Sequence, residues 1–421
     1  MVNFQSILKS QRKIEWFFLI GVLIFVSVYS AVTLTTKPAY WYDEAINVEL
    51  SRNFADFGKL DLIIAPNTFS GAGATVGSTG YPVTLPLAGF FKLFGFGLAQ
   101  ARVYMLFWMS ACILSLFFVA KRLWGPRVAY FGTLLFATFA PFYGNGRSVM
   151  GEIPGFLFFL LSFYFFEKRK FLVSGILLGL AVVSKPSVFV FLIPAYTLAV
   201  LFSGGAWKSR FLNLCKLGAS SLLALVPWLV IYSGEISRGG LAGNIIAHFK
   251  NPYSEAGASA LQNIAHNLPT LATSTTLLYF WVLLAGVVAA LFFERTLLRE
   301  HRYLLILSGT YLPLVLFQYL KSFGYLRYLI AAEFLVFILF LISLPVLARW
   351  IVSFCHPREN GDPVLDSRLR GNDRASLYAV TILIVMIIFQ TVHLFWFSDL
   401  FPSEKTQKTI AYISREYPQE L

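Results

Sequence analysis

The stretch FFLIGVLIFVSVYSA, residues 17–31, is a continuous apolar run that follows a basic segment. It does not alternate between polar and apolar positions, as a strand of a membrane barrel would. About 20 apolar residues in a helix span a bilayer, and runs of this kind fill most of the chain. Of the 421 residues, 57% are hydrophobic and only 13% are charged, which is too little charge for a soluble core of this size. The sequence therefore predicts an all-α polytopic membrane protein.

The apolar runs predict about eleven transmembrane helices, and basic patches occupy every second connection between them. The spans are expected at residues 14–34, 98–120, 128–144, 148–166, 171–184, 186–203, 211–232, 276–293, 302–320, 326–348 and 377–399. The first is expected to be retained, because no small-residue cleavage site follows it. The positive-inside rule places the N-terminus in the cytoplasm and the C-terminus in the periplasm. The net charge of +13 then reflects topology, and no nucleic-acid partner is expected.

One transmembrane domain is predicted over residues 1–399, followed by a short periplasmic tail over 400–421. Two large periplasmic segments are expected, at 35–97 and 233–275. A cytoplasmic connection over 354–376 is polar and rich in turn-forming residues between 356 and 374. It is expected to be a disordered insertion without chemistry.

The first periplasmic segment contains an expected amphipathic helix over residues 43–57, which Gly58 ends. Its apolar side chains recur on one face, so the helix is expected to lie flat at the membrane interface. The glycine-rich run SGAGATVGSTG, residues 70–80, lacks the spacing of a dinucleotide loop and has no Gly-Lys-Ser/Thr ending. This run is expected to be a mobile loop.

Charged side chains near the predicted outer membrane face need an explanation, because charge in a bilayer costs about 2.5–3.5 kcal/mol per residue on insertion scales. The candidates are Asp43, Glu44, Arg102, Arg147, Glu152, Lys185, Lys321, Arg327 and the neighbouring Tyr328. Acidic residues among basic ones suit an anionic, membrane-anchored substrate. Basic side chains stabilise a phosphate leaving group, and a carboxylate takes the proton of an attacking hydroxyl. One such base is enough for a single displacement with inversion.

Each candidate also has a structural interpretation. Asp43 stands where a helix cap is expected, and Glu152 is close enough in sequence to pair with Arg147. The lysine and arginine candidates at span ends suit snorkelling toward lipid head groups. Glu333 is expected inside a span, where it must be neutral or paired, for example with Arg102, and no role is assigned to it. No cluster of histidines or cysteines has the spacing of a metal site.

Six short motifs occur in a characteristic order. They are YWYDEA at 40–45, YPVTLPL at 81–87, QARVY at 100–104, GRSVMGEIP at 146–154, GLAVVSKP at 179–186 and RYLI at 327–330. The ordered set resembles the GT-C class of integral membrane glycosyltransferases. It is most similar to the branch that holds the protein O-mannosyltransferases and the lipid A aminoarabinose transferases, and the resemblance extends over residues 14–399.

The resemblance implies an inverting glycosyltransferase in a bacterial inner membrane, with its active site facing the periplasm. The sugar would pass from a polyprenyl phosphate carrier to a hydroxyl of lipid A, a polysaccharide or a protein. Asp43 inherits the role of base or acceptor-positioning residue, within an acidic Asp43-Glu44 motif. Glu152 matches the second acidic position of the family, so Asp43, Glu44 and Glu152 are the expected catalytic residues. Some members use a divalent metal and others do not, and the residues here indicate none.

The resemblance also implies which residues hold the donor phosphate. Lys185 matches the basic residue after the fifth span, and Arg327 with Tyr328 matches the Arg-Tyr pair near a late span. Lys321, Arg147 and Arg102 are further candidates for holding the phosphate on charge alone.

Two other classes of function stay open. A transporter or flippase of a lipid-linked sugar would place polar residues near the bilayer midplane and often shows repeated halves. The sequence has no internal repeat, and most of its charge lies at the ends of spans. A non-catalytic scaffold of envelope assembly would tolerate Glu152→Gln, which an enzyme that uses this carboxylate would not.

Overall fold

The computed structural model describes residues 4–66, 68–70, 78–233, 260–322, 324–355 and 364–397. Helices make up most of it, as the composition predicted. In chain order the elements are α1 (Phe4–Val32), α2 (Tyr42–Phe57), β1 (Ile63–Ala65), β2 (Thr68–Phe69), α3 (Tyr81–Phe94), α4 (Leu98–Leu123), α5 (Pro126–Thr138), α6 (Ala140–Gly146), α7 (Glu152–Glu167), α8 (Phe171–Ser184), α9 (Pro186–Phe189), α10 (Leu192–Leu201), α11 (Trp207–Ser233), α13 (Ala260–Thr273), α14 (Thr275–Phe293), α15 (Thr296–Glu300), α16 (Arg302–Lys321), the 3₁₀ helix η4 (Leu326–Leu329), α17 (Ile330–Cys355), α18 (Val364–Val392) and the π-helical turn η5 (His393–Phe397).

Seven stretches of helix in the described chain are long and apolar enough to cross a membrane. They are Arg12–Val32, Leu98–Leu123, Trp207–Val230, Thr275–Phe293, Arg302–Lys321, Leu326–Phe354 and Asp373–Trp396. The polytopic, all-α class is therefore confirmed. The remaining predicted spans coincide with the shorter helices α5, α7, α8 and α10, which have 13, 16, 14 and 10 residues. The count of eleven and the orientation in the membrane stay predictions.

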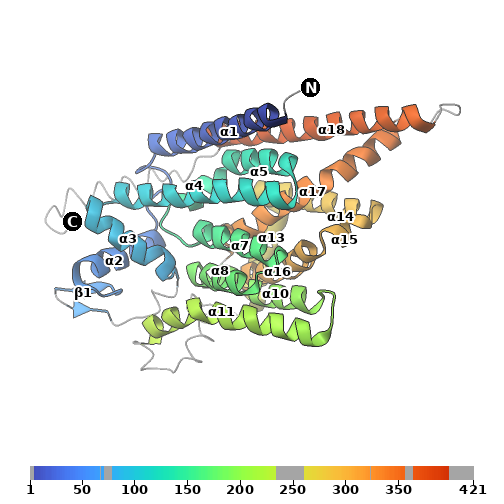
Figure 1. Ribbon diagram of the computed structural model, residues 1–421. Helices are drawn as coiled ribbons and strands as arrows, with labels where there is room; N and C mark the ends of the chain where they lie inside the picture. The colour runs from blue at the N-terminus through green and yellow to red at the C-terminus, as the bar shows by residue number, and fades with distance from the viewer. Residues whose placement is uncertain are drawn as a thin grey trace.

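The most enclosed helix of the bundle is α17. In its most apolar window 89% of the residues are buried inside the protein, against 22% for the corresponding windows of α1, α11 and α18. Figure 1 shows α1 and α18 along one side of the bundle and α11 along the opposite side. Aromatic rings fill the centre: Phe334 of α17 stacks on Phe136 of α5 at 4.2 Å and meets Phe156 of α7 at 4.8 Å between ring centres. Such contacts favour close packing.

The helix α2 forms where it was predicted, and it buries polar side chains as well as apolar ones. It ends at Gly58, whose backbone is in the left-handed region (φ 69°). Any residue with a Cβ would adopt this conformation only at a cost in stability. Its buried residues include the polar Asp43, Glu44 and Asn47 as well as Leu50 of the expected apolar face, whereas Phe57 at its end is 57% exposed. The buried polar side chains find partners in the protein: the Asn47 amide donates to Thr79 Oγ1 at 3.1 Å and to the Val149 carbonyl at 2.7 Å. The charged residues Arg52 and Asp56 lie on the exposed face, and a position flat at the membrane interface stays a prediction.

Together with α3 and the antiparallel pair β1–β2, α2 forms a cap at one end of the bundle, on the left in Figure 1. Neither α3 nor the strands were predicted from the sequence. Of the glycine-rich run at 70–80, residues 71–77 lie outside the described residues. Its last part is packed: Thr79 is fully buried, and a Cβ on Gly80 would lie 2.2 Å from the carbonyl oxygen of Val183.

The predicted insertion loop is shorter than expected. Because α17 ends at Cys355 and α18 begins at Val364, part of the stretch predicted to be disordered is helical. Residues 356–363 lie outside the described part of the chain, as do 234–259 of the second periplasmic segment and the tail at 400–421. The described remainder of the second segment is the helix α13.

Gly151 allows the start of α7 to lie against the end of α8. A Cβ at this position would lie 1.7 Å from the Ser184 carbonyl oxygen. Replacing Gly151 by alanine should therefore force the two helices apart and lower stability by about 1–3 kcal/mol, the usual cost of overpacking. The measurement is thermal unfolding in detergent. Gly309→Ala in α16, where nothing lies within 4 Å of the added atom, is the matched control and should be neutral or stabilising.

Candidate active site

Four segments that are far apart in sequence meet beneath the cap formed by α2 and α3. They are the start of α2, the connection between α6 and α7, the junction of α8 with α9, and η4. Their charged side chains form two groups. The Asp43–Arg327 cluster consists of Asp43, Glu152, Lys185 and Arg327, and the Glu44–Arg102 cluster consists of Glu44, Arg102 and Arg147.

Asp43 and Arg327 form an ion pair across 284 residues of sequence. The Arg327 Nη2 group donates to Asp43 Oδ2 at 2.5 Å, and the two side chains are 13% and 10% exposed. Asp43 does not cap its helix, because the capping position is Trp41, whose side chain makes no capping hydrogen bond. The carboxylate is therefore held by an arginine at a slightly open position.

Aromatic rings surround the Arg327 guanidinium. Its central carbon lies 4.8 Å from the ring centre of Tyr325, 5.6 Å from that of Tyr328 and 6.0 Å from that of Trp41. The Nη1 group makes a weak contact with the Met150 sulfur at 3.6 Å, and the buried Nε atom has no hydrogen-bond partner within the described chain. Arg327 thus keeps donor capacity for a ligand while Asp43 holds it in place.

Glu152 faces Lys185 rather than Arg147. The Lys185 ammonium lies 3.9 Å from Glu152 Oε1 and donates to Ser78 Oγ at 3.3 Å, and both charged side chains are at least 97% buried. Neither carboxylate oxygen of Glu152 has a hydrogen-bond partner among the described residues. Since Glu152 begins α7, the positive end of the helix dipole also favours its negative charge. The pair with Arg147 suggested by sequence proximity was wrong.

The pKa of Lys185 is lowered from its ordinary value. Burial is the main cause, and the nearby positive charge of Arg327 acts in the same direction. The carboxylates of Glu152 and Asp43 oppose the shift, Glu152 more strongly. All four side chains therefore act on one another electrostatically and behave as one site.

Glu44 and Arg102 form a closed pair. Arg102 Nε and Nη2 donate to the two carboxylate oxygens of Glu44 at 2.9 and 2.8 Å, and Nη1 donates to the Leu34 carbonyl at 2.8 Å. Both side chains are fully buried. Successive residues of a helix point about 100° apart, which explains how Asp43 and Glu44 reach different clusters. Every nitrogen of the Arg102 guanidinium donates to Glu44 or to the Leu34 carbonyl, which ties α4 to the chain around the start of α2. The role of Arg102 in holding a donor phosphate stays a prediction.

Arg147 is also fully buried and joins α6 to α1. It donates to Thr33 Oγ1 at 2.7 Å and to the Tyr143 carbonyl at 3.3 Å, and it lies 6.0 Å from the ring centre of Tyr29. Burial lowers the pKa of Arg147 to about 10, and Arg102 contributes in the same direction. These contacts place Arg147 with Glu44 and Arg102 rather than with Asp43, and its role in holding phosphate stays a prediction.

Two further candidates are placed apart from these pairs. Lys321 ends α16 with its ammonium 5.8 Å from the ring centre of Phe317, one turn earlier on the same helix. Glu333 is 95% buried in α17. Its suggested pair with Arg102 was wrong, because Glu44 and Leu34 already occupy that guanidinium.

Sequence reasoning missed several neighbours of the site. Ser78 belongs to the glycine-rich run that was expected to be a mobile loop, and no local signal distinguishes it. Trp41, Tyr325 and Met150 adjoin predicted residues, and an aromatic ring beside a charged residue is a signal that was available. Within the described ranges, no group of three or more His, Cys, Asp or Glu side chains could hold a metal ion.

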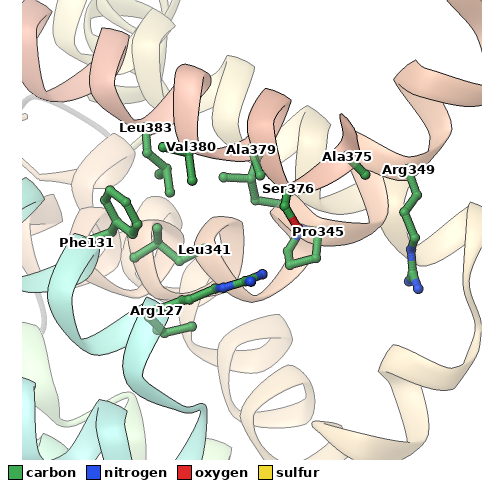
Figure 2. A pocket seen from close by; sticks show the side chains of 12 residues that line it. Arg127, Phe131, Leu341, Pro345, Arg349, Ala375, Ser376, Ala379, Val380 and Leu383 are labelled. Carbon is green, nitrogen blue, oxygen red and sulfur yellow. The ribbon is translucent and has the colours of Figure 1, made fainter. Parts of the chain in front are cut away.

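A hollow of about 270 Å³ lies between α5, α17 and α18, away from both clusters. Figure 2 shows Arg127 and Arg349 on either side of Pro345 in its wall. Arg349 is paired with Glu294, and no carboxylate lines the hollow. The combination of acid and base that a group transfer requires is therefore found at the Asp43–Arg327 cluster and not in this hollow.

This fold is that of the GT-C class of integral membrane glycosyltransferases, and the resemblance seen in the sequence motifs is confirmed. The sequence model of the dolichyl-phosphate-mannose-protein mannosyltransferase family matches residues 83–231, a range that contains Glu152 and Lys185. No curated protein is significantly similar to the chain in sequence.

Solved structures of two kinds share the fold. The crystal structure of ArnT from Cupriavidus metallidurans bound to undecaprenyl phosphate has a TM-score of 0.57 and 16% identity, over 95% of this chain and 80% of that one. The oligosaccharyltransferase AglB from Archaeoglobus fulgidus, in complex with an inhibitory peptide and a dolichol-phosphate, has a TM-score of 0.54 and 13% identity. That match covers 96% of this chain and 59% of the archaeal one, so this chain spans only part of its length. At such identities the likeness concerns the fold.

Proposed function

We propose that the chain is an inverting glycosyltransferase of a bacterial inner membrane, with its active site at the Asp43–Arg327 cluster facing the periplasm. It takes a sugar from a polyprenyl phosphate and transfers it to a hydroxyl of lipid A, a polysaccharide or a protein. The observation that carries the proposal is the meeting of two ion pairs, Asp43–Arg327 and Glu152–Lys185, at one end of a GT-C fold. The polyprenyl phosphates in ArnT and AglB, which share this fold, support the class of donor.

The acceptor hydroxyl is activated by Asp43 in this mechanism. The hydroxyl oxygen attacks the anomeric carbon and forms the new glycosidic bond while its proton passes to Asp43. The bond between the anomeric carbon and the phosphate oxygen breaks on the opposite face of the sugar. Its electron pair leaves with the polyprenyl phosphate, so a single displacement inverts the anomeric configuration.

The leaving phosphate is stabilised by Lys185 and Arg327. Charge builds up on the phosphate as the bond breaks, and fixed positive charges in a buried site stabilise it more than water would. Among the described residues, the Nε atom of Arg327 has no hydrogen-bond partner, and the Lys185 ammonium contacts Glu152 at 3.9 Å and the Ser78 hydroxyl at 3.3 Å. Glu152 keeps Lys185 oriented, and its two unpartnered oxygens are available to accept from sugar hydroxyls.

The direct test uses the purified protein in proteoliposomes with a radiolabelled polyprenyl phosphate sugar and candidate acceptors. Covalent transfer that requires Asp43 is the expected result. Movement of the donor across the bilayer without transfer would instead identify a transporter. Two results together would identify a scaffold. Glu152→Gln would keep full activity in cells, and a strain that lacks the gene would have unchanged envelope glycans.

The lowered pKa of Lys185 predicts an early alkaline decline in transfer. As the pH rises, the ammonium loses its proton before an ordinary lysine would, and a neutral amine cannot stabilise the phosphate. Arginine stays charged throughout this range, so Lys185→Arg should move the decline to higher pH. The measurement is the pH profile of kcat/KM, with Lys92→Arg at an exposed position of α3 as the control. Identical profiles for all three proteins would contradict the role given to Lys185.

A further inference from the structure

A second hollow, of about 510 Å³, lies between the turn that joins α7 to α8 and the beginning of α11. Because α7 begins and α8 ends at the candidate active site, this turn lies at the far end of α7. The 16 residues of α7 separate the two places by about 24 Å. Nothing in the proposed transfer mechanism uses the residues here.

Basic and amide side chains from two elements line the hollow. Arg169 and Lys170 come from the turn, and Ser209, Asn213 and Lys216 come from α11. The three residues of α11 are spaced by four and three positions, so they form a stripe along one helix face. The hollow therefore offers three positive charges, a hydroxyl and an amide on two facing walls.

No carboxylate forms a close pair with the basic side chains of the hollow, Arg169, Lys170 and Lys216, in the described part of the chain, and no acidic residue is part of the lining. The nearest acid in sequence is Glu167, which ends α7 outside the lining and interacts electrostatically with Arg302, Arg169 and Lys168. Its negative charge is therefore shared among three cations, and an anion in the hollow would meet three basic side chains with no carboxylate in the lining.

The backbone at Arg169 is strained. Its φ of 56° lies in the left-handed region, where it is alone among the described non-glycine residues. Its amide donates to the Phe166 carbonyl and that of Lys170 to the Phe165 carbonyl, both at 2.9 Å, which closes the end of α7. Glycine would close the same turn without strain. An arginine at this position therefore costs stability, and its side chain, whose Nη2 group makes a long contact of 3.5 Å with the Tyr303 hydroxyl, supplies what a glycine would lack.

The outer edge of the hollow meets an exposed apolar surface. Leu172 in the first turn of α8 is 55% exposed, and on α11 Trp207, Phe211 and Leu212 are 63%, 57% and 54% exposed. Both helices belong to apolar segments of the bundle, so this surface is suited to acyl chains, with Trp207 at the interface. A small soluble anion would use the charges alone, whereas a lipid would use both surfaces.

We propose that this hollow binds the head group of an anionic phospholipid in the leaflet opposite the active site. The phosphate lies among Arg169, Lys170 and Lys216, Ser209 and Asn213 donate to the head group, and the acyl chains run along the apolar surface. Basic pockets between membrane helices on the cytoplasmic side are suited to such lipids. Bound there, the lipid joins α8 to α11 and stabilises the bundle.

The test measures binding of the full-length protein to nanodiscs or mixed micelles that contain phosphatidylglycerol, through the rise in unfolding temperature or through native mass spectrometry. Arg169→Gly and Lys216→Gln should each weaken binding about fivefold, and the double variant about 25-fold. Arg169→Gly should also raise the unfolding temperature without lipid, since it relieves the strain, so weaker binding cannot be attributed to misfolding. Lys208→Gln, one residue before the stripe and outside the lining, is the matched control.

Three outcomes would overturn the proposal. Inorganic phosphate that protects as well as phosphatidylglycerol would identify a site for free anions. Phosphatidylcholine that protects equally would show that the charge is irrelevant. A loss in Lys208→Gln as large as in Lys216→Gln would show general attraction of basic residues to an anionic surface.

Discussion

Asp43→Asn should lower the rate of sugar transfer by about 10²–10⁴-fold, the usual contribution of a general base. Asparagine has nearly the same shape and can still accept the hydrogen bond from Arg327, but it cannot take a proton from the acceptor hydroxyl. The affinity for the polyprenyl phosphate donor should change little, because Lys185 and Arg327 remain. Initial rates in proteoliposomes, together with donor binding by the same preparation, provide the measurement.

The matched control is Asp56→Asn at the other end of α2. Asp56 pairs with Arg52 at 3.6 Å on the exposed face, and its side chain is 52% exposed. The change removes the same charge from the same helix, and transfer should stay at the wild-type level. Turnover by folded Asp43→Asn at the rate of this control would remove the proposed mechanism.

Glu44→Gln should destabilise the protein by about 3–5 kcal/mol, because it leaves the fully buried Arg102 guanidinium without a counter-charge. Replacing both members, as in Glu44→Leu with Arg102→Met, should recover much of this loss, since apolar side chains need no partner. Thermal unfolding in detergent measures both effects.

The same variant separates structure from catalysis at two adjacent residues. The molecules of Glu44→Gln that remain folded should transfer sugar at a rate close to wild type, unlike those of Asp43→Asn. Glu49→Gln, which breaks the exposed pair with Arg52 at 3.6 Å, should change stability little. If Glu44→Gln keeps the wild-type unfolding temperature but loses transfer, Glu44 belongs to the active site after all.

Local patterns explain why the fold class could be predicted. The runs that became α1, α4 and α17 are apolar over most of their length, and that property does not depend on the rest of the chain. The cap was harder to predict. Whether α2 buries Asn47 or Phe57 depends on Thr79 and Val149 supplying hydrogen-bond partners, and both come from other parts of the sequence.

The same distinction holds for the candidate site. The order of acidic and basic residues pointed to Asp43, Glu152, Lys185 and Arg327, but equally to Glu44, Arg102, Arg147 and Lys321, and it could not separate the two groups. The partner of each could not be predicted, because it depends on how close two helix ends come. Glu152 faces Lys185, 33 residues away, and not Arg147, five residues away, since the end of α8 lies against Gly151 at the start of α7.

The enclosure of α17 has a consequence for biosynthesis. Its segment has the highest mean hydropathy of the seven long ones, 2.6, although little of it contacts lipid in the finished bundle. Such high hydropathy favours insertion of α17 into the membrane. Its position in the finished bundle depends instead on close packing with neighbours such as α14 and α18. Since α18 is made after α17, a nascent chain that has reached only Cys355 still exposes one side of α17 to lipid. The bundle can close around α17 only when α18 has been inserted.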